Sequence, residues 1–205
     1  VNYELKNFSV GGYGTYQSFL RLEDLFDKQD KIKIVIVTYL PDHAIRNIGD
    51  EFWLRTLTKF TRRGYVSLPY ASIDGEGKLL RIEPISYFRT PFMDHLSISN
   101  KIAKRIMRYK LKDNHKNAYP VTNLIFEDMK NFLDKKNVRL IVLNLSNEKK
   151  ALEPYKRTFD KKKIDTINCN YEQTEELTIK GDGHPNHLMH SMFAECIFKE
   201  LKKFT

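Results

Sequence analysis

Two runs of apolar, mostly β-branched residues constrain the fold of this chain more than any other feature: IKIVIVT at residues 32–38 and VRLIVLNL at residues 138–145. Continuous runs of this kind are typical of strands that are covered on both faces, as in parallel sheets. A shorter strand candidate, KIDTIN, follows at residues 163–168. The sequence therefore predicts a sheet whose strands are widely separated along the chain.

Helical periodicity lies between and around these runs. Apolar residues recur at helical spacing in three segments: 15–29, 121–136 and about 185–203. We expect the second helix to open after Pro120 with Thr122 as its cap, and the third to have Pro185 at its first position. Strands that alternate with helices predict an α/β fold: a three-layer α/β/α sandwich with a mainly parallel sheet.

One segment interrupts this alternation. Residues 64–84, GYVSLPYASIDGEGKLLRIEP, read as a β-hairpin around Asp74-Gly75-Glu76-Gly77, inserted into the α/β core. The chain of 205 residues shows no internal repeat and no low-complexity linker. Its length suits one domain with a substantial core, so we expect residues 1–205 to form a single domain.

The chain is basic, with 35 Lys and Arg against 26 Asp and Glu, a net charge of +9 and a pI of about 9.4. The densest basic run is residues 101–116, in which Ile102, Ile106 and Tyr109 fall at near-helical spacing. This pattern predicts an amphipathic helix with a solvated basic face. Contact with an anionic surface, such as nucleic acid, anionic lipid or acidic polysaccharide, is the alternative; no specific nucleic-acid module accompanies the run.

Two cysteines, Cys169 and Cys196, are too few for a zinc knuckle and define no disulfide framework. Cys196 occupies an apolar position of the last helical pattern, which predicts a buried thiol. The apolar runs are far shorter than the roughly 18 residues of a membrane span, and we expect no transmembrane segment and no signal peptide within this sequence. The first residue is Val, so we expect an excised piece of a longer protein; cytoplasmic and cell-envelope locations both stay open.

The stretch GDGHPNHLMH, residues 181–190, is the first candidate site. A carboxylate at Asp182 beside the imidazole of His184 can fix the tautomer of the ring and stabilise its protonated form. A plain turn before a helix is the alternative. Metal binding by His184, His187 and His190 is disfavoured because three-residue spacings diverge around a helix. We expect no metal ion and no cofactor.

Two further segments are polar or glycine-rich where ligands bind in open α/β sheets, beyond the carboxyl ends of strands. NFSVGGYGTYQ, residues 7–17, can present backbone N–H groups to an anion or oxyanion, although it is not a phosphate loop; a structural turn is the alternative. TYLPDHAIRN, residues 38–47, supplies four candidate site-lining residues, Asp42, His43, Arg46 and Asn47; an ordinary polar loop is the alternative.

Taken together, these three segments resemble the SGNH (GDSL-type) hydrolases, a flavodoxin-like α/β/α family of esterases and lipase-like acyl hydrolases. NFSVGGYGT resembles the family's second block, which implies that Gly12 is an oxyanion-hole residue. Pro41-Asp42 takes the place of the Asn-Asp pair of the third block. GDGHPN resembles the last block, with Asp182 and His184 as catalytic residues, although the usual spacing is Asp-x-x-His.

The chain departs from the family in two ways. The block with the nucleophilic Ser precedes the Asn-Gly block in the family, and nothing like it occurs here; we expect it, with the first strand, upstream of Val1. Pro41 replaces an Asn whose amide is an oxyanion donor, and the loss of one such donor typically costs roughly 10²–10³ in kcat.

The resemblance implies an ester hydrolase with a Ser-His-Asp mechanism that removes acyl groups from a small molecule, a glycan or a lipid. A catalytically inactive binding or scaffold protein of the same fold is the alternative. Polyanion binding through residues 101–116 is a third, weaker hypothesis.

Overall fold

The computed structural model describes residues 4–28, 31–88, 92, 95–111, 114–148 and 150–204. The chain forms two compact units. The first comprises residues up to 8, 32–41 and 132 onward, and the second comprises residues 9–31 and 42–131.

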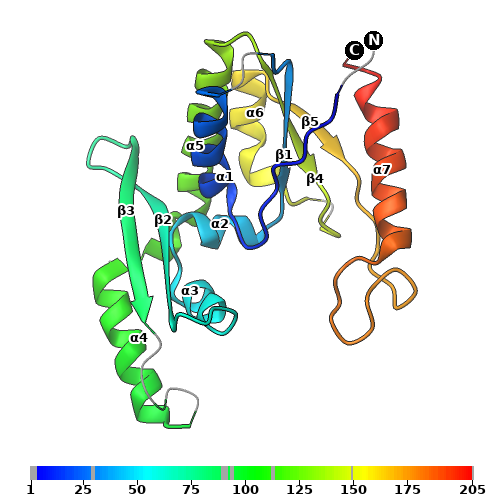
Figure 1. Cartoon of the computed structure of the whole chain (residues 1–205). Helices are drawn as coiled ribbons and strands as arrows, with labels where there is room; N and C mark the ends of the chain where they lie inside the picture. Colours follow the sequence, from blue (N-terminus) through cyan, green and yellow to red (C-terminus); the bar gives the residue numbers. More distant parts are fainter. Residues whose placement is uncertain are drawn as a thin grey trace. The chain divides into compact units, whose positions relative to one another are not determined.

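The first unit contains a three-stranded parallel sheet (Figure 1). Its strands are β1 (Ile34–Tyr39), β4 (Arg139–Asn144) and β5 (Asp165–Asn168), in the order β1-β4-β5. Both pairs are parallel, with Ile34 opposite Arg139 and Ile141 opposite Asp165. The two strands predicted from the apolar runs and the shorter third candidate are all confirmed, and so is the α/β class.

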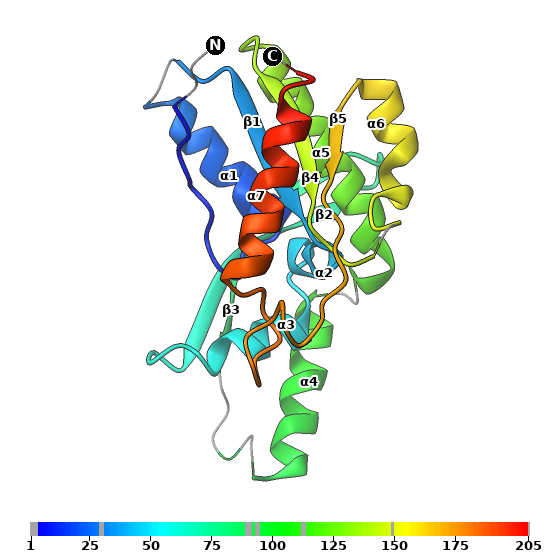
Figure 2. The ribbon, with the colours of Figure 1, turned by 90° about the vertical axis from the view of Figure 1, so that its right-hand side faces the viewer.

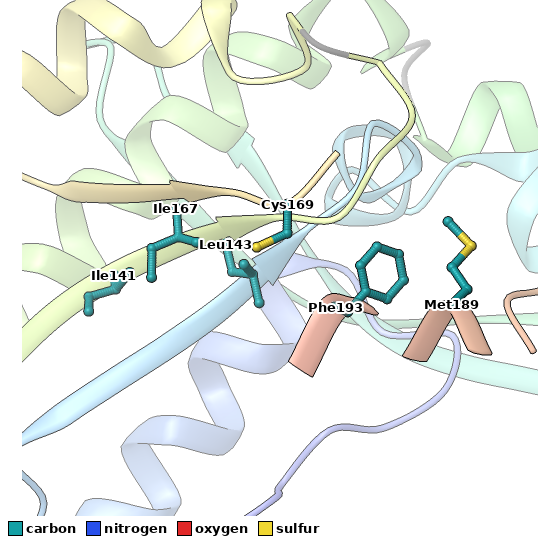
Figure 3. Close-up of a cluster of buried hydrophobic side chains, with 6 residues drawn as sticks. All are labelled: Ile141, Leu143, Ile167, Cys169, Met189 and Phe193. Carbon is teal, nitrogen blue, oxygen red and sulfur yellow. The ribbon is translucent and has the colours of Figure 1, made fainter. Parts of the chain in front are cut away.

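Helices cover both faces of this sheet within the first unit. On one face, α7 (His187–Leu201) crosses the strands (Figure 2) and packs on a core cluster shown in Figure 3, made of Ile141, Leu143, Ile167, Cys169, Met189 and Phe193. Side chains alternate along a strand, so Tyr39 points to the opposite face. There its hydroxyl lies 2.6 Å from that of Tyr155, which ends a short 3₁₀ turn (η2, Glu153–Tyr155) before α6 (Lys156–Lys162).

The two edges of the sheet differ. The outer edge belongs to β5, which is four residues long and carries Asp165 and Asn168 at its ends. Short, polar strands are a common way to protect an edge. The other edge belongs to β1, IVIVTY, which has no charge and no proline and, in the part of the chain that the structure describes, pairs with β4 alone.

The second unit is built around an antiparallel pair, β2 (Tyr65–Ile73) and β3 (Leu79–Phe88). The Asp74 carboxylate closes their turn by accepting hydrogen bonds from the backbone N–H groups of Glu76 and Lys78, both at 2.8 Å. The predicted hairpin is therefore confirmed. The remaining elements are α1 (Thr15–Phe26), α2 (Asp42–Asn47), α3 (Glu51–Thr58), α4 (Ser97–Leu111), η1 (Asn114–Asn117) and α5 (Ala118–Asp134), whose end belongs to the first unit.

Two predicted helix starts are wrong. Helix α5 begins at Ala118, and the Thr122 hydroxyl donates to the Ala118 carbonyl within the helix (2.7 Å) instead of capping it. Pro120 lies in the first turn, where its missing N–H costs nothing. Helix α7 begins at His187 with Asn186 as its N-cap, and Pro185 lies before the helix, bridged to Thr178.

The amphipathic helix predicted in the basic run is present as α4, but its orientation differs from the expectation. Its buried residues are Ala103 and Met107, which join a core cluster with Leu54, Tyr70 and Tyr87. The three apolar residues that define the sequence pattern, Ile102, Ile106 and Tyr109, are exposed instead.

Candidate active site

The Asp182–His184 segment lies in a loop, residues 169–186, that leaves the carboxyl end of β5 and leads into α7 (Figures 1 and 2). A tight turn shapes its tip. The backbone N–H of Ile179 donates to the His184 carbonyl (2.8 Å), and the N–H groups of Asp182 and Gly183 donate back to the Ile179 carbonyl (3.1 and 3.0 Å). Gly183 has φ +78°, a left-handed conformation that favours glycine.

This turn brings the two predicted catalytic side chains together. Nδ1 of His184 lies 2.5 Å from Oδ1 of Asp182. A carboxylate at this position selects the tautomer with the proton on Nδ1, which leaves Nε2 as the basic nitrogen. The side chains are 76% and 54% exposed, and no other described residue bonds the His184 ring. The segment is thus both a turn and an Asp–His pair.

Asn186 fixes the end of the loop. Its side-chain oxygen accepts from the backbone N–H groups of Leu188 and Met189 (3.0 and 3.3 Å), and its amide nitrogen donates to the Glu176 carbonyl (2.7 Å). This is the N-cap interaction expected for Asn. His187 lies exposed beyond the cap, and among the described residues no three His, Cys, Asp or Glu side chains gather as a metal site would require.

A disulfide joins the two ends of this region. Cys169, directly after β5, is bonded to Cys196 in α7, with 5.9 Å between their Cα atoms. The prediction of a buried free thiol at Cys196 is therefore wrong. The bond closes a loop that contains both Asp182 and His184, and sequence spacing alone did not indicate it.

The glycine segment lies in the second unit, where it packs against α2. Gly12 has φ +83°, and its backbone N–H has no hydrogen-bond partner among the described residues. The Gly14 N–H donates to Oε1 of Gln17 (2.8 Å), which fixes the start of α1. A Cβ atom at Gly14 would lie 2.6 Å from Oδ1 of Asn47, so only glycine fits there.

Asn47 holds this arrangement from α2. Its side chain is fully buried, its oxygen accepts from the Tyr16 N–H (2.8 Å), and its nitrogen donates to the Thr122 hydroxyl (2.9 Å). Both ends of the amide are therefore engaged in connecting α1, α2 and α5. Asn47 has a structural role in this unit, and its amide is not available as a donor to a bound oxyanion.

The other three candidates on α2 have different surroundings. The Arg46 guanidinium lies 4.1 Å from the centre of the Trp53 ring and donates to the Tyr13 carbonyl (3.2 Å); burial lowers its pKa. Asp42 is exposed, 3.9 Å from Arg46. Burial, with a smaller effect of nearby Arg46, lowers the pKa of His43 to about 3, so its ring is neutral at physiological pH.

A second Asp–His pair connects residues far apart in the sequence. The nearly buried Asp50 caps α3 through the N–H groups of Phe52 and Trp53 (2.9 and 3.3 Å) and lies 2.8 Å from Nε2 of His115. An Asp directly before a helical pattern could have indicated the cap. No local signal connects it to His115.

The predicted site residues therefore fall into two groups. Asp182 and His184 form a pair in the first unit; Gly12, Asp42, His43, Arg46 and Asn47 lie in the second, where α2 adjoins the glycine segment. Comparison with protein-family models, with curated proteins and with solved structures finds no match. The resemblance to SGNH hydrolases therefore rests on the three motifs alone.

Proposed function

We propose that this chain carries the acid–base residues of a carboxylic ester hydrolase of the SGNH type, with a flavodoxin-like α/β/α fold. The observation that supports the proposal most is the 2.5 Å contact between Nδ1 of His184 and Oδ1 of Asp182. A carboxylate bonded to one imidazole nitrogen, with the other nitrogen accessible, is the arrangement that a general base requires.

In the proposed reaction, Nε2 of His184 accepts the proton of a serine hydroxyl as that oxygen attacks the ester carbonyl carbon. The ester C–O bond then breaks, and His184 returns the proton to the leaving alcohol while the acyl group stays on the serine oxygen. Water, whose proton His184 accepts, then attacks that acyl group, which releases the carboxylic acid and restores the serine hydroxyl. Asp182 keeps the imidazole in its productive tautomer and offsets the charge of the imidazolium. Gly12 is the proposed oxyanion donor on the strength of the motif resemblance alone, and the proposed mechanism includes no metal ion or cofactor.

The nucleophilic serine belongs, in this proposal, to a strand that precedes Val1 in the full protein. The edge of β1, which pairs with no described strand except β4, supports this part of the proposal, because a further parallel strand there would end at the same side of the sheet as β5. Ligands bind at that side in open α/β sheets. The proposed substrate is an O-acyl group on a small molecule, a glycan or a lipid.

The test is hydrolysis of p-nitrophenyl acetate by the full-length protein. His184→Ala is expected to lower kcat/KM by about 10²–10⁴-fold, the usual contribution of a general base. Asp182→Asn is expected to lower it as well. His187→Ala is the matched control, because this exposed histidine lies three residues along the chain and no carboxylate among the described residues is bonded to its ring. Its rate should stay within about twofold of the wild type.

Equal rates in the wild type and His184→Ala would refute the proposal. A binding protein of the same fold would then be favoured, because Pro41 cannot supply the donor that an Asn supplies at that position. Such a protein would retain an acylated ligand without hydrolysing it.

A further inference from the structure

The outer face of α4 carries an unusual exposed apolar surface. Ile98, Ile102 and Ile106 are 66%, 54% and 49% exposed, and Tyr109 is 87% exposed. Residues four apart advance about 40° around a helix, so these four side chains lie within about 80° of one another. We call them the α4 stripe.

The α4 stripe points away from the core of its own unit. The side of the helix that packs inward is marked by Ala103 and Met107, each 5% exposed, against Leu54, Tyr70 and Tyr87. The mean direction of these two positions is about 125° around the helix from the mean direction of the stripe. The helix is therefore held in place by one face while a second apolar face is left in solvent.

Positive charge accompanies the stripe along one flank. Lys101 and Arg105 are exposed, Lys104 is half-buried, and the sequence has no Asp or Glu between Asp94 and Asp113. A helix with a basic flank and a stripe of large apolar side chains is typical of segments that lie in the interface of an anionic lipid bilayer. No described helix is both long enough and apolar enough to pass through a bilayer.

We propose that α4 is a docking surface for an anionic lipid membrane, with the α4 stripe inserted among the headgroups and the lysines and arginine in contact with lipid phosphates. Apolar side chains exposed in solvent gain free energy when they leave water, and cations near an anionic bilayer gain electrostatic free energy. This inference does not depend on the proposed esterase activity.

Two other occupants fit less well. Nucleic acid and acidic polysaccharides are bound through their charges, and such binding gives the isoleucines of the stripe no role. A second copy of this chain would bring two helices without acidic residues against each other, and like charges repel. An anionic membrane satisfies both the charge and the apolar stripe.

The test is flotation of the full-length protein with vesicles of phosphatidylcholine alone or with 30% phosphatidylglycerol. Binding is expected only to the anionic vesicles and is expected to weaken between 0.1 and 0.5 M salt. Ile102→Ser with Ile106→Ser is expected to reduce partitioning about tenfold or more, since two exposed isoleucines no longer leave water. Lys101→Gln with Lys104→Gln should give a loss of similar size.

Lys156→Gln with Lys161→Gln, two exposed lysines on α6, is the charge-matched control and should change partitioning by less than about twofold. Tyr109→Trp supplies a direct probe: the emission that it adds to that of the native Trp53 should shift to the blue and be quenched by brominated lipid.

Four results would overturn the proposal. They are no binding to anionic vesicles, binding that is insensitive to the isoleucine variants, retention on heparin or nucleic acid with no vesicle binding, and concentration-dependent dimerisation that the isoleucine variants abolish. Circular dichroism of each variant shows that a loss of binding is not a loss of folding.

Discussion

The disulfide between Cys169 and Cys196 yields a stability prediction that can be worked from the structure. The two residues are 27 apart in the sequence. In the chain-entropy model, a cross-link closing a loop of about 28 residues removes about 12 cal/mol/K from the unfolded state, or about 3.6 kcal/mol at 25 °C. Loss of the bond should therefore lower the free energy of unfolding by roughly 3–4 kcal/mol.

The variant of choice is Cys196→Ser, because Cys169 is 1% exposed in the core and its replacement would also disturb packing. Urea unfolding followed by circular dichroism measures the free energy. Reduction of the wild type with dithiothreitol should reproduce the effect of the substitution, and the same reductant should not change Cys196→Ser.

Thiol titration under denaturing conditions provides an independent check. Wild-type protein purified without reductant and kept in air should show no free thiol. Two reactive thiols in that sample, or a Cys196→Ser variant within about 0.5 kcal/mol of the wild type, would refute the reasoning.

Two other predictions concern the second unit. Gly14→Ala should lower the free energy of unfolding by about 1–3 kcal/mol, because its Cβ would lie 2.6 Å from Oδ1 of Asn47. Gly11→Ala is the control: a Cβ there would have nothing within 4 Å, so its free energy of unfolding should stay within about 0.5 kcal/mol of the wild type. Urea unfolding of both variants measures the difference. His43 has a pKa of about 3 when folded and about 6.5 when unfolded, so the unfolded chain binds more protons in that window and stability should fall as the pH falls. From pH 7.5 to 5 the loss from this group is about 2 kcal/mol. His43→Gln should flatten the pH dependence by that amount, and an unchanged slope in the variant would contradict the assignment.

The strands of the first unit could be predicted because β1 and β4 are apolar on both faces, and such runs fit few other environments. The β2–β3 hairpin could be predicted equally well, because the residues that form its turn are adjacent in the sequence. Helix α4 shows what apolar periodicity does not predict. Periodicity located a helix there, but Ile102 and Ile106 define a stripe that its own unit does not bury. A periodic pattern reports that an apolar face exists and not what covers it.

In the candidate site, too, local contacts could be predicted from the sequence and long-range contacts could not. Asp182 and His184 could be paired from sequence because they are two residues apart and a turn is enough to bring them together. The roles of Asn47 and of the two cysteines could not be predicted, since they depend on segments tens of residues away. The burial of Asn47 converts a residue that looked available for binding into one that holds three helices together.

The edge of the sheet at β1 affects the solubility of this chain. Among the described residues only β4 pairs with this six-residue strand, which has no charge and no proline. Backbone groups on its other side can therefore pair with an extended peptide, including the same strand in another molecule. Preparations of this chain should therefore aggregate increasingly as the protein concentration rises. A version of the protein in which another strand pairs with that edge of β1 should remain soluble at the same concentration. A comparison of the solubility of the two proteins therefore tests whether a further strand pairs with β1.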